Sequence, residues 1–171
     1  GDICLVFKAD ATDVFTLAFT ICPGRSFGLA GDVLYIGRLQ GSRRQMDLIR
    51  ASARNCNGIS QQTLLLAAAE GICLAMGIRW MVCPSSRAQL SVGRQDEFSS
   101  GVSIYDQFWL DIGATRLGEE NFHLPVPMPH KPTSQIKRCH RSRAAGRRRY
   151  RDAVSDQARQ IFRELFIEGK K

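Results

Sequence analysis

The chain has 171 residues, of which 44% are hydrophobic and 23% charged, and its formal net charge at pH 7 is +8. This length predicts one domain over residues 1–171 that buries its core without disulfides or metals. This composition is ordinary for a soluble globular protein. The longest apolar run, residues 64–76, is broken by Glu70 and Gly71, so we expect no transmembrane segment. Because the chain starts almost directly in a strand-like run without Met, we interpret it as lacking an N-terminal region.

Three strands are expected at the start of the chain. Residues 2–8 and 14–22 are rich in β-branched and aromatic side chains, which predicts an antiparallel pair. Residues 23–28 form a loop in this interpretation, and residues 33–38 form the third strand of a meander. The Gly-Arg-Leu-Gln-Gly segment that ends it is expected to turn sharply and to expose backbone N–H groups.

Helices are expected next, over residues 46–56 and 61–76. Asn57-Gly58 ends the first helix, Ser60 is a good N-cap for the second, and Gly77 stops it. The expected buried face of the second helix consists of Leu64, Leu65, Ala68, Ile72, Ala75 and Met76. Residues 79–83 then predict a buried strand.

The remaining chain is predicted to alternate between loops and regular elements. Residues 87–101 are expected to form a loop, residues 103–112 a helix capped by Ser103 and ended by Gly113, and residues 122–126 a strand. From about residue 134 the chain is basic and helical, and residues 137–171 form a C-terminal helical segment of the same domain. Its expected packing stripe consists of Val154, Ile161, Leu165 and Phe166.

This order predicts an α+β fold, with an antiparallel-rich mixed sheet and flanking helices. The order of the elements resembles the acyl-CoA N-acyltransferase fold. In that fold a central strand ends in a phosphate-cradling loop, a long helix follows, and a later strand–helix unit carries a Tyr near its start. Fold alone does not determine function.

Two segments are candidate anion sites. Backbone N–H groups freed by glycine, with two guanidinium groups nearby, fit a phosphate of a donor such as acyl-CoA. The residues of this donor site are Gln40, Gly41, Ser42, Arg43 and Arg44. The alternative is a turn capped by polar residues. In the acyltransferase fold this loop leads directly into the long helix, whereas here the helix over 46–56 lies between them, which argues against binding of CoA. Residues 57–60, before the long helix, are the second candidate, with an ordinary cap as the alternative.

Tyr105 is the candidate general acid, and Asp106 or Glu119 is the candidate general base, if these residues lie in a cleft. We select Tyr105 and Asp106 as the catalytic pair. The alternative for Tyr105 is a core position, because it lies one turn before Trp109. His123, His130 and His140 lack the spacing of a zinc site, so no metal is expected.

The positive charge is concentrated between residues 137 and 151, in Lys137, Arg138, Arg141, Arg143, Arg147, Arg148, Arg149 and Arg151. Arg147, Arg148 and Arg149 are the candidate anion-binding residues, for anionic lipid, lipopolysaccharide or an acidic partner. A solvated helix face is the alternative. Only Tyr150 lies among these arginines, so nucleic acid is not an expected partner.

The six cysteines form no CxxC pair, and four of them lie in or beside apolar runs, which indicates buried free thiols in a reducing compartment. We therefore expect a cytoplasmic protein, with peripheral attachment to the inner membrane as a variant of that interpretation.

Four stretches together are similar to the bacterial VirK/YbjX family, whose biochemical activity is not established. They are residues 34–41 (LYIGRLQG), the helix–Asn57-Gly58-Ile59–helix that follows, residues 105–109 (YDQFW) with Gly113, and residues 122–125 (FHLP). The basic residues 147–151 (RRRYR) fit the family's C-terminal helix, and the resemblance covers about residues 2–162. The chain departs from the family pattern at residues 58–61 and 84–89.

The resemblance implies roles in virulence, in envelope stress and in resistance to cationic antimicrobial peptides, but no substrate. Two functions follow as hypotheses. The first is an acyltransferase-like transferase that uses a phosphate-bearing donor. The second is a non-enzymatic, envelope-associated factor that docks on an anionic membrane or a partner through its arginine-rich helix.

Overall fold

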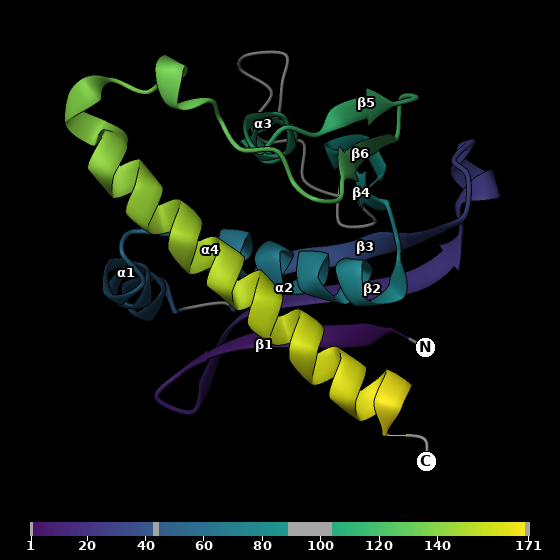
Figure 1. The fold of residues 1–171 in the computed structure, drawn as a ribbon, viewed down its shortest axis with the longest axis horizontal. Coiled ribbons are helices and arrows are strands. Elements are labelled where there is room, and N and C mark those ends of the chain that lie inside the picture. Colours follow the sequence, from purple (N-terminus) through teal and green to yellow (C-terminus); the bar gives the residue numbers. More distant parts are fainter. Residues whose placement is uncertain (1, 43–44, 89–103, 170–171) are drawn as a thin grey trace.

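The computed structural model describes residues 2–42, 45–88 and 104–169 (Figure 1). The described residues form a six-stranded sheet in the order β1-β2-β3-β4-β6-β5. The strands are β1 (Ile3–Ala9), β2 (Thr12–Pro23), β3 (Asp32–Gly41), β4 (Trp80–Pro84), β5 (Thr115–Leu117) and β6 (Asn121–Pro125). The α-helices are α1 (Met46–Asn55), α2 (Gln61–Met76), α3 (Ile104–Asp111) and α4 (Arg141–Phe162).

The sheet is mixed, which confirms the predicted α+β class. Strands β1, β2 and β3 form the predicted antiparallel meander. β3 then pairs in parallel with β4 through Leu34↔Met81 and Tyr35↔Val82. A parallel pair needs a crossover, and α1 and α2 provide it. β6 pairs antiparallel with β4 and with β5, a three-residue strand that the sequence analysis missed.

The caps of α2 are those that the sequence predicts. The Ser60 side chain accepts a hydrogen bond from the Thr63 N–H, and Gly77 ends the helix in the left-handed conformation with φ of 71°. α2 contacts the sheet on one side and α4 on the other, as the stacked ribbons of Figure 1 indicate. Burial on two sides explains why Glu70 and Gly71 are buried together with the leucines. Met76, predicted to be buried, lies in the last turn and is 43% exposed.

α4 differs most from its prediction. Regular α-helix begins at Arg141, after short 3-10 turns at Thr133–Gln135 and Arg138–His140. Val154 packs against the core, but Ile161, Leu165 and Phe166 are exposed. The reason is the path of the helix: α4 crosses α2 diagonally, and its C-terminal end reaches past the edge strand β1 (Figure 1). A pattern of apolar residues shows which face packs, but not how far the partner helix extends.

Two smaller corrections concern the first half of the chain. The loop expected at residues 23–28 contains a 3-10 turn, Gly24–Phe27, and β3 continues through Gly41 instead of ending at residue 38.

Of the cysteines expected to be buried, Cys73 and Cys83 are buried, whereas Cys4 is exposed, and all six thiols are free. The predicted loop over 87–101 and the Ser103 cap lie largely outside the described residues. None of the helices in the described part of the chain is long and apolar enough to cross a membrane.

Candidate functional site

The first two residues of the segment predicted to cradle a phosphate belong to strand β3. Gln40 and Gly41 are paired with Thr16 and Phe15 of β2. The Ser42 N–H donates to the Val14 carbonyl at 2.9 Å, and its hydroxyl donates to the Asp13 carbonyl at 2.6 Å. These sheet contacts overturn the expected sharp turn, and they leave the Ser42 N–H engaged within the protein. Arg43 and Arg44 lie outside the described residues.

Gly41 has a packing reason to be glycine. A Cβ at this position would lie 3.0 Å from the Phe15 ring and 3.3 Å from the Ile49 Cδ1. Contacts this short require the neighbours to move. Gly41 therefore lets the end of β3 approach α1 closely.

Gln40 and Tyr105 lie in one groove, which we call the sheet-face groove. It has a volume of about 750 Å³, and its lining includes Thr20, Tyr35, Arg38, Gln40, Pro84 and Tyr105. These residues come from β2, β3, the end of β4 and the second position of α3. The structure thus joins one predicted donor-binding residue to one predicted catalytic residue.

The alternation of side chains along β3 explains the position of this groove. Leu34 and Ile36 are fully buried in the core that contains the α2 leucines. Successive strand residues point to opposite faces, so Tyr35 and Gly37 face away from that core. A register shift between Ala18 and Phe19 of β2 adds a bulge at this point. The groove therefore lies over the face of the sheet that α2 does not cover.

The groove holds two phenols and a guanidinium. The Tyr35 ring stacks on Phe27, with centroids 5.5 Å apart, and its burial is the main cause that raises the pKa of its hydroxyl. The Tyr105 ring packs edge-on against Trp109 at 5.5 Å. The sequence analysis did not select Tyr35 or Arg38. The alternation around Leu34 and Ile36 could have indicated that Tyr35 faces the other side.

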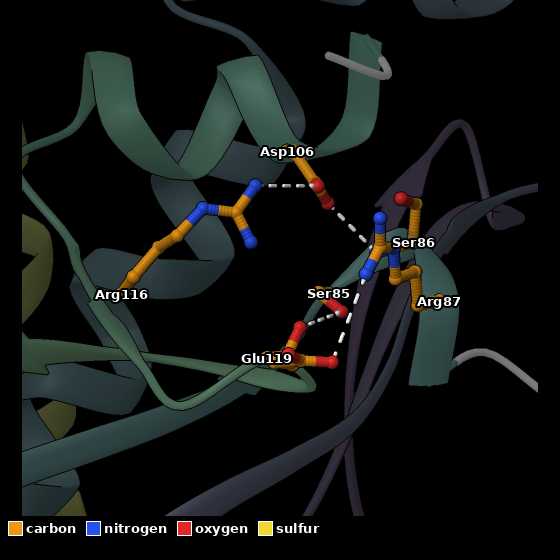
Figure 2. A network of polar contacts seen from close by, with 6 residues as sticks. All are labelled: Ser85, Ser86, Arg87, Asp106, Arg116 and Glu119. Carbon is orange, nitrogen blue, oxygen red and sulfur yellow. Dashed lines mark hydrogen bonds and ion pairs between the residues drawn. The ribbon is translucent and has the colours of Figure 1, made fainter. Parts of the chain in front are cut away.

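A polar network anchors the start of α3, next to Tyr105 (Figure 2). The Asp106 carboxylate is buried and accepts a hydrogen bond from the Ser86 N–H at 2.7 Å. Its other oxygen accepts from the Arg116 guanidinium at 3.3 Å. The Arg116 guanidinium also lies 4.8 Å from the centre of the Phe122 ring. Asp106 therefore ties α3 to the segment after β4 and to β5.

The same network continues to the turn between β5 and β6. The Ser85 hydroxyl donates to the Glu119 carbonyl at 3.3 Å, and the Arg87 guanidinium lies 3.8 Å from the Glu119 carboxylate. Asp106 is not among the residues that line the sheet-face groove. Its oxygens point into this network instead (Figure 2), so Tyr105 and Asp106, adjacent in sequence, face different surroundings.

A second groove, which we call the basic groove, has a volume of about 720 Å³. It lies between α4, the start of α2 and the segment of residues 130–136. Arg147 and Arg148 line it, whereas Arg149, the third predicted anion-binding residue, does not. The Arg147 Nε donates to the Asn57 carbonyl at 3.0 Å, and the Arg148 Nη2 donates to the Lys131 carbonyl at 2.9 Å.

Metal ligands do not gather in either groove. Among the described residues, no group of three His, Cys, Asp or Glu side chains could hold a metal ion. His130 lies in the basic groove, where burial and the adjacent Arg151 lower its pKa. Burial raises the pKa of the Cys73 and Cys83 thiols well above the usual range, which keeps both protonated and unreactive.

Comparison with known proteins gives a family without an assigned activity. The profile of a family described as "Protein of unknown function (DUF535)" matches residues 1–161. No curated protein and no solved structure matches the chain.

Proposed function

The chain belongs to the DUF535 family of proteins of unknown function, and from that premise we propose that it is a transferase of the acyl-CoA N-acyltransferase type. The proposed site is the sheet-face groove. The observation that carries the proposal is the meeting of Gln40, near the end of β3, with Tyr105, at the start of α3, in one groove.

The order of strands supports the finer likeness to that fold. A meander leads into a central strand, helices cross to a parallel neighbour, and a strand–helix unit with a Tyr near its start follows. α1 is the departure, because it stands between the central strand and the long helix. Gly41 and Ser42 do not line the groove, and the Ser42 N–H is hydrogen-bonded within the protein. Gln40 is therefore the described residue that we propose to contact the donor.

The proposed reaction moves an acyl group from a thioester donor to an amine or hydroxyl of an acceptor. A new C–N or C–O bond forms as the C–S bond breaks. Tyr105 gives its phenolic proton to the leaving sulphur and recovers one from the acceptor, so that the protons balance. For Asp106 we propose a positioning role instead of the base role, because both of its oxygens accept hydrogen bonds.

Substitutions of the two residues test this proposal. We expect acyl-CoAs of short and long chain to raise the melting temperature of the wild type, and Gln40→Ala to weaken that binding. Tyr105→Phe should retain binding and lower the release of CoA thiol on the order of 100-fold, as for the loss of a general acid. Tyr150→Phe and Gln160→Ala, on α4 outside the groove, are the matched controls. Absence of any shift with acyl-CoA, or equal thiol release by Tyr105→Phe, would contradict the proposal.

The non-enzymatic alternative has less support. Consecutive helical residues point about 100° apart, so Arg147, Arg148 and Arg149 do not share one face that could lie on a membrane. Two of them also line a groove.

The resemblance to the VirK/YbjX family adds a biological setting to the proposal. We propose a bacterial protein of the cytoplasm that modifies an envelope component and thereby supports resistance to antimicrobial peptides. The six free cysteines support the reducing compartment.

A further inference from the structure

The basic groove shares no lining residue with the sheet-face groove. We propose that it binds a soluble ligand that carries at least two phosphate groups. This inference does not depend on the proposed transferase activity.

The charge of the groove carries the argument. Its lining contains five permanent cations, Lys131, Arg143, Arg147, Arg148 and Arg151, and none of its described lining residues is Asp or Glu. Like charges held together repel one another and favour binding of an anion. A single phosphate carries about two negative charges, so five cations match two or more phosphates better than one.

The guanidinium groups are fixed in place by the protein. Arg147 donates one N–H to the backbone carbonyl of Asn57, and Arg148 donates one N–H to the backbone carbonyl of Lys131. A guanidinium has five N–H donors, so each retains donors for a ligand. Arginines held in this way lose little side-chain freedom when they bind phosphate.

The neighbouring acid does not neutralise this charge. Asp152 lies beside the groove, with its Oδ1 at 3.4 Å from the His130 Nε2. The Arg151 Nη2 contacts the His130 Nδ1 at 2.6 Å. Burial and Arg151 lower the pKa of His130, so its ring is neutral near pH 7 and accepts from Arg151. The buried Glu70 carboxylate also interacts with Arg151, and two carboxylates against five cations still leave a net positive groove.

The shape fits a small ligand. A volume of about 720 Å³ is within the range of small-molecule sites. An adjoining hollow of about 460 Å³ shares Gly58, Arg143 and Arg147 with it and adds Arg54. Ile59 and Ile136 supply apolar contact area. The Ser60 hydroxyl is already used to cap α2, so the arginines and not the helix end provide the anion-binding capacity.

Calorimetric titration with inorganic pyrophosphate tests the proposal. We expect binding to the wild type, weaker binding of inorganic phosphate, and at least a 10-fold loss of pyrophosphate affinity in Arg143→Gln with Arg147→Gln. The matched control, Arg149→Gln with Arg159→Gln, makes the same change of charge with exposed arginines of α4 that do not line the groove. Arg143→Gln alone removes one cation but keeps the hydrogen bond between Arg147 and Asn57. Circular dichroism verifies that each variant is folded.

Three outcomes would overturn the proposal. One is no binding of pyrophosphate, and another is equal loss of affinity in the groove variant and its control. The third is that the wild type binds phosphatidylglycerol vesicles but not pyrophosphate, and that the groove variant loses the vesicle binding. That result would identify the ligand as a lipid surface. Tyr105→Phe should bind pyrophosphate as the wild type does, so failure of the transferase proposal leaves this result unaffected.

Discussion

Two buried carboxylates connect the core to the segments that border the grooves. Asp106 accepts from the Ser86 N–H just after β4. Glu70, in the middle of α2, accepts from the Met128 N–H, two residues before His130 of the basic groove. A buried carboxylate is tolerated where hydrogen bonds satisfy it. Both residues therefore hold the backbone of these segments in place.

Glu70 should make the stability of the protein depend on pH. Burial is the largest influence on the pKa of its carboxyl and raises it. The hydrogen bond from the Met128 N–H and the charge of Arg151 lower the pKa by less. Because the folded protein holds this proton more tightly than the unfolded chain, the contribution of Glu70 to stability is lost as the pH rises through the raised pKa.

In Glu70→Gln the side-chain oxygen can still accept from Met128, but it no longer ionises. We therefore expect the free energy of unfolding of wild type, relative to Glu70→Gln, to fall as the pH rises above 4.5, the ordinary pKa of a glutamate, and through the raised pKa of Glu70 in the folded protein. Urea denaturation at several pH values measures this difference. The exposed Glu120→Gln is the control, and a constant difference across the range would contradict the assignment.

At the scale of elements, the contact between α2 and α4 depends on a glycine. A Cβ on Gly71 would lie 2.1 Å from the Ser155 carbonyl oxygen and 2.9 Å from the Arg159 nitrogen, both backbone atoms of α4. Backbone atoms cannot rotate away as a flexible side chain can. The two helices therefore pack as closely as they do because residue 71 has no side chain.

Gly71→Ala should separate α4 from α2 and cost about 1–3 kcal/mol or more of stability, as overpacking does. Gly146 of α4 is the matched comparison, since a Cβ there meets nothing within 4 Å. Gly146→Ala should raise stability by up to about 1 kcal/mol, because alanine favours helix. Thermal or urea denaturation of both variants measures the contrast. Equal effects of the two substitutions would show that the helices do not pack at Gly71.

At the scale of the whole molecule, the main core cluster lies on the face of the sheet that carries Leu34 and Met81, although Val33 and Val82, which alternate with them, are also fully buried. The largest fully buried side chains include Trp109 of α3, Phe19 of β2, Phe122 of β6 and Leu66 of α2, so the core is assembled from distant parts of the chain. The other face of β1 to β3 borders the sheet-face groove. Phe162, the last residue of α4, packs against this core, whereas Leu165 and Phe166 in the helical segment that follows are exposed.

Leu165 is 66% and Phe166 60% exposed, whereas Leu66 is 1% exposed. We expect Leu165→Ser with Phe166→Ser to change the free energy of unfolding by less than about 1 kcal/mol, because exposed positions contribute little. Leu66→Ala should cost about 2–5 kcal/mol, as for a buried leucine. Chemical denaturation of both variants measures these effects. A large loss in the surface variant would mean that these residues are covered.

The sequence predicted the elements best where local chemistry determines them. Ser60 and Gly77 bracket α2 at the expected residues, and the β-branched runs of β1 and β2 form the expected pair. Caps and turns act between neighbouring residues, so they can be recognised without knowledge of the fold. The continuation of β3 through Gly41 was missed because it depends on pairing with Phe15 of a different strand.

The candidate sites show the same division. Sequence alone selected Gln40, Tyr105 and Arg147, and it located the positive charge of the C-terminal segment. Only the tertiary structure placed Gln40 and Tyr105 in one groove. It also showed that Asp106 is buried in a hydrogen-bond network. Finally, it showed that Arg147 and Arg148 line the basic groove whereas Arg149 does not. The physical reason is that hydrogen bonds within a turn or helix act between near neighbours in sequence. Strand register, helix crossing and burial depend on residues far apart along the chain.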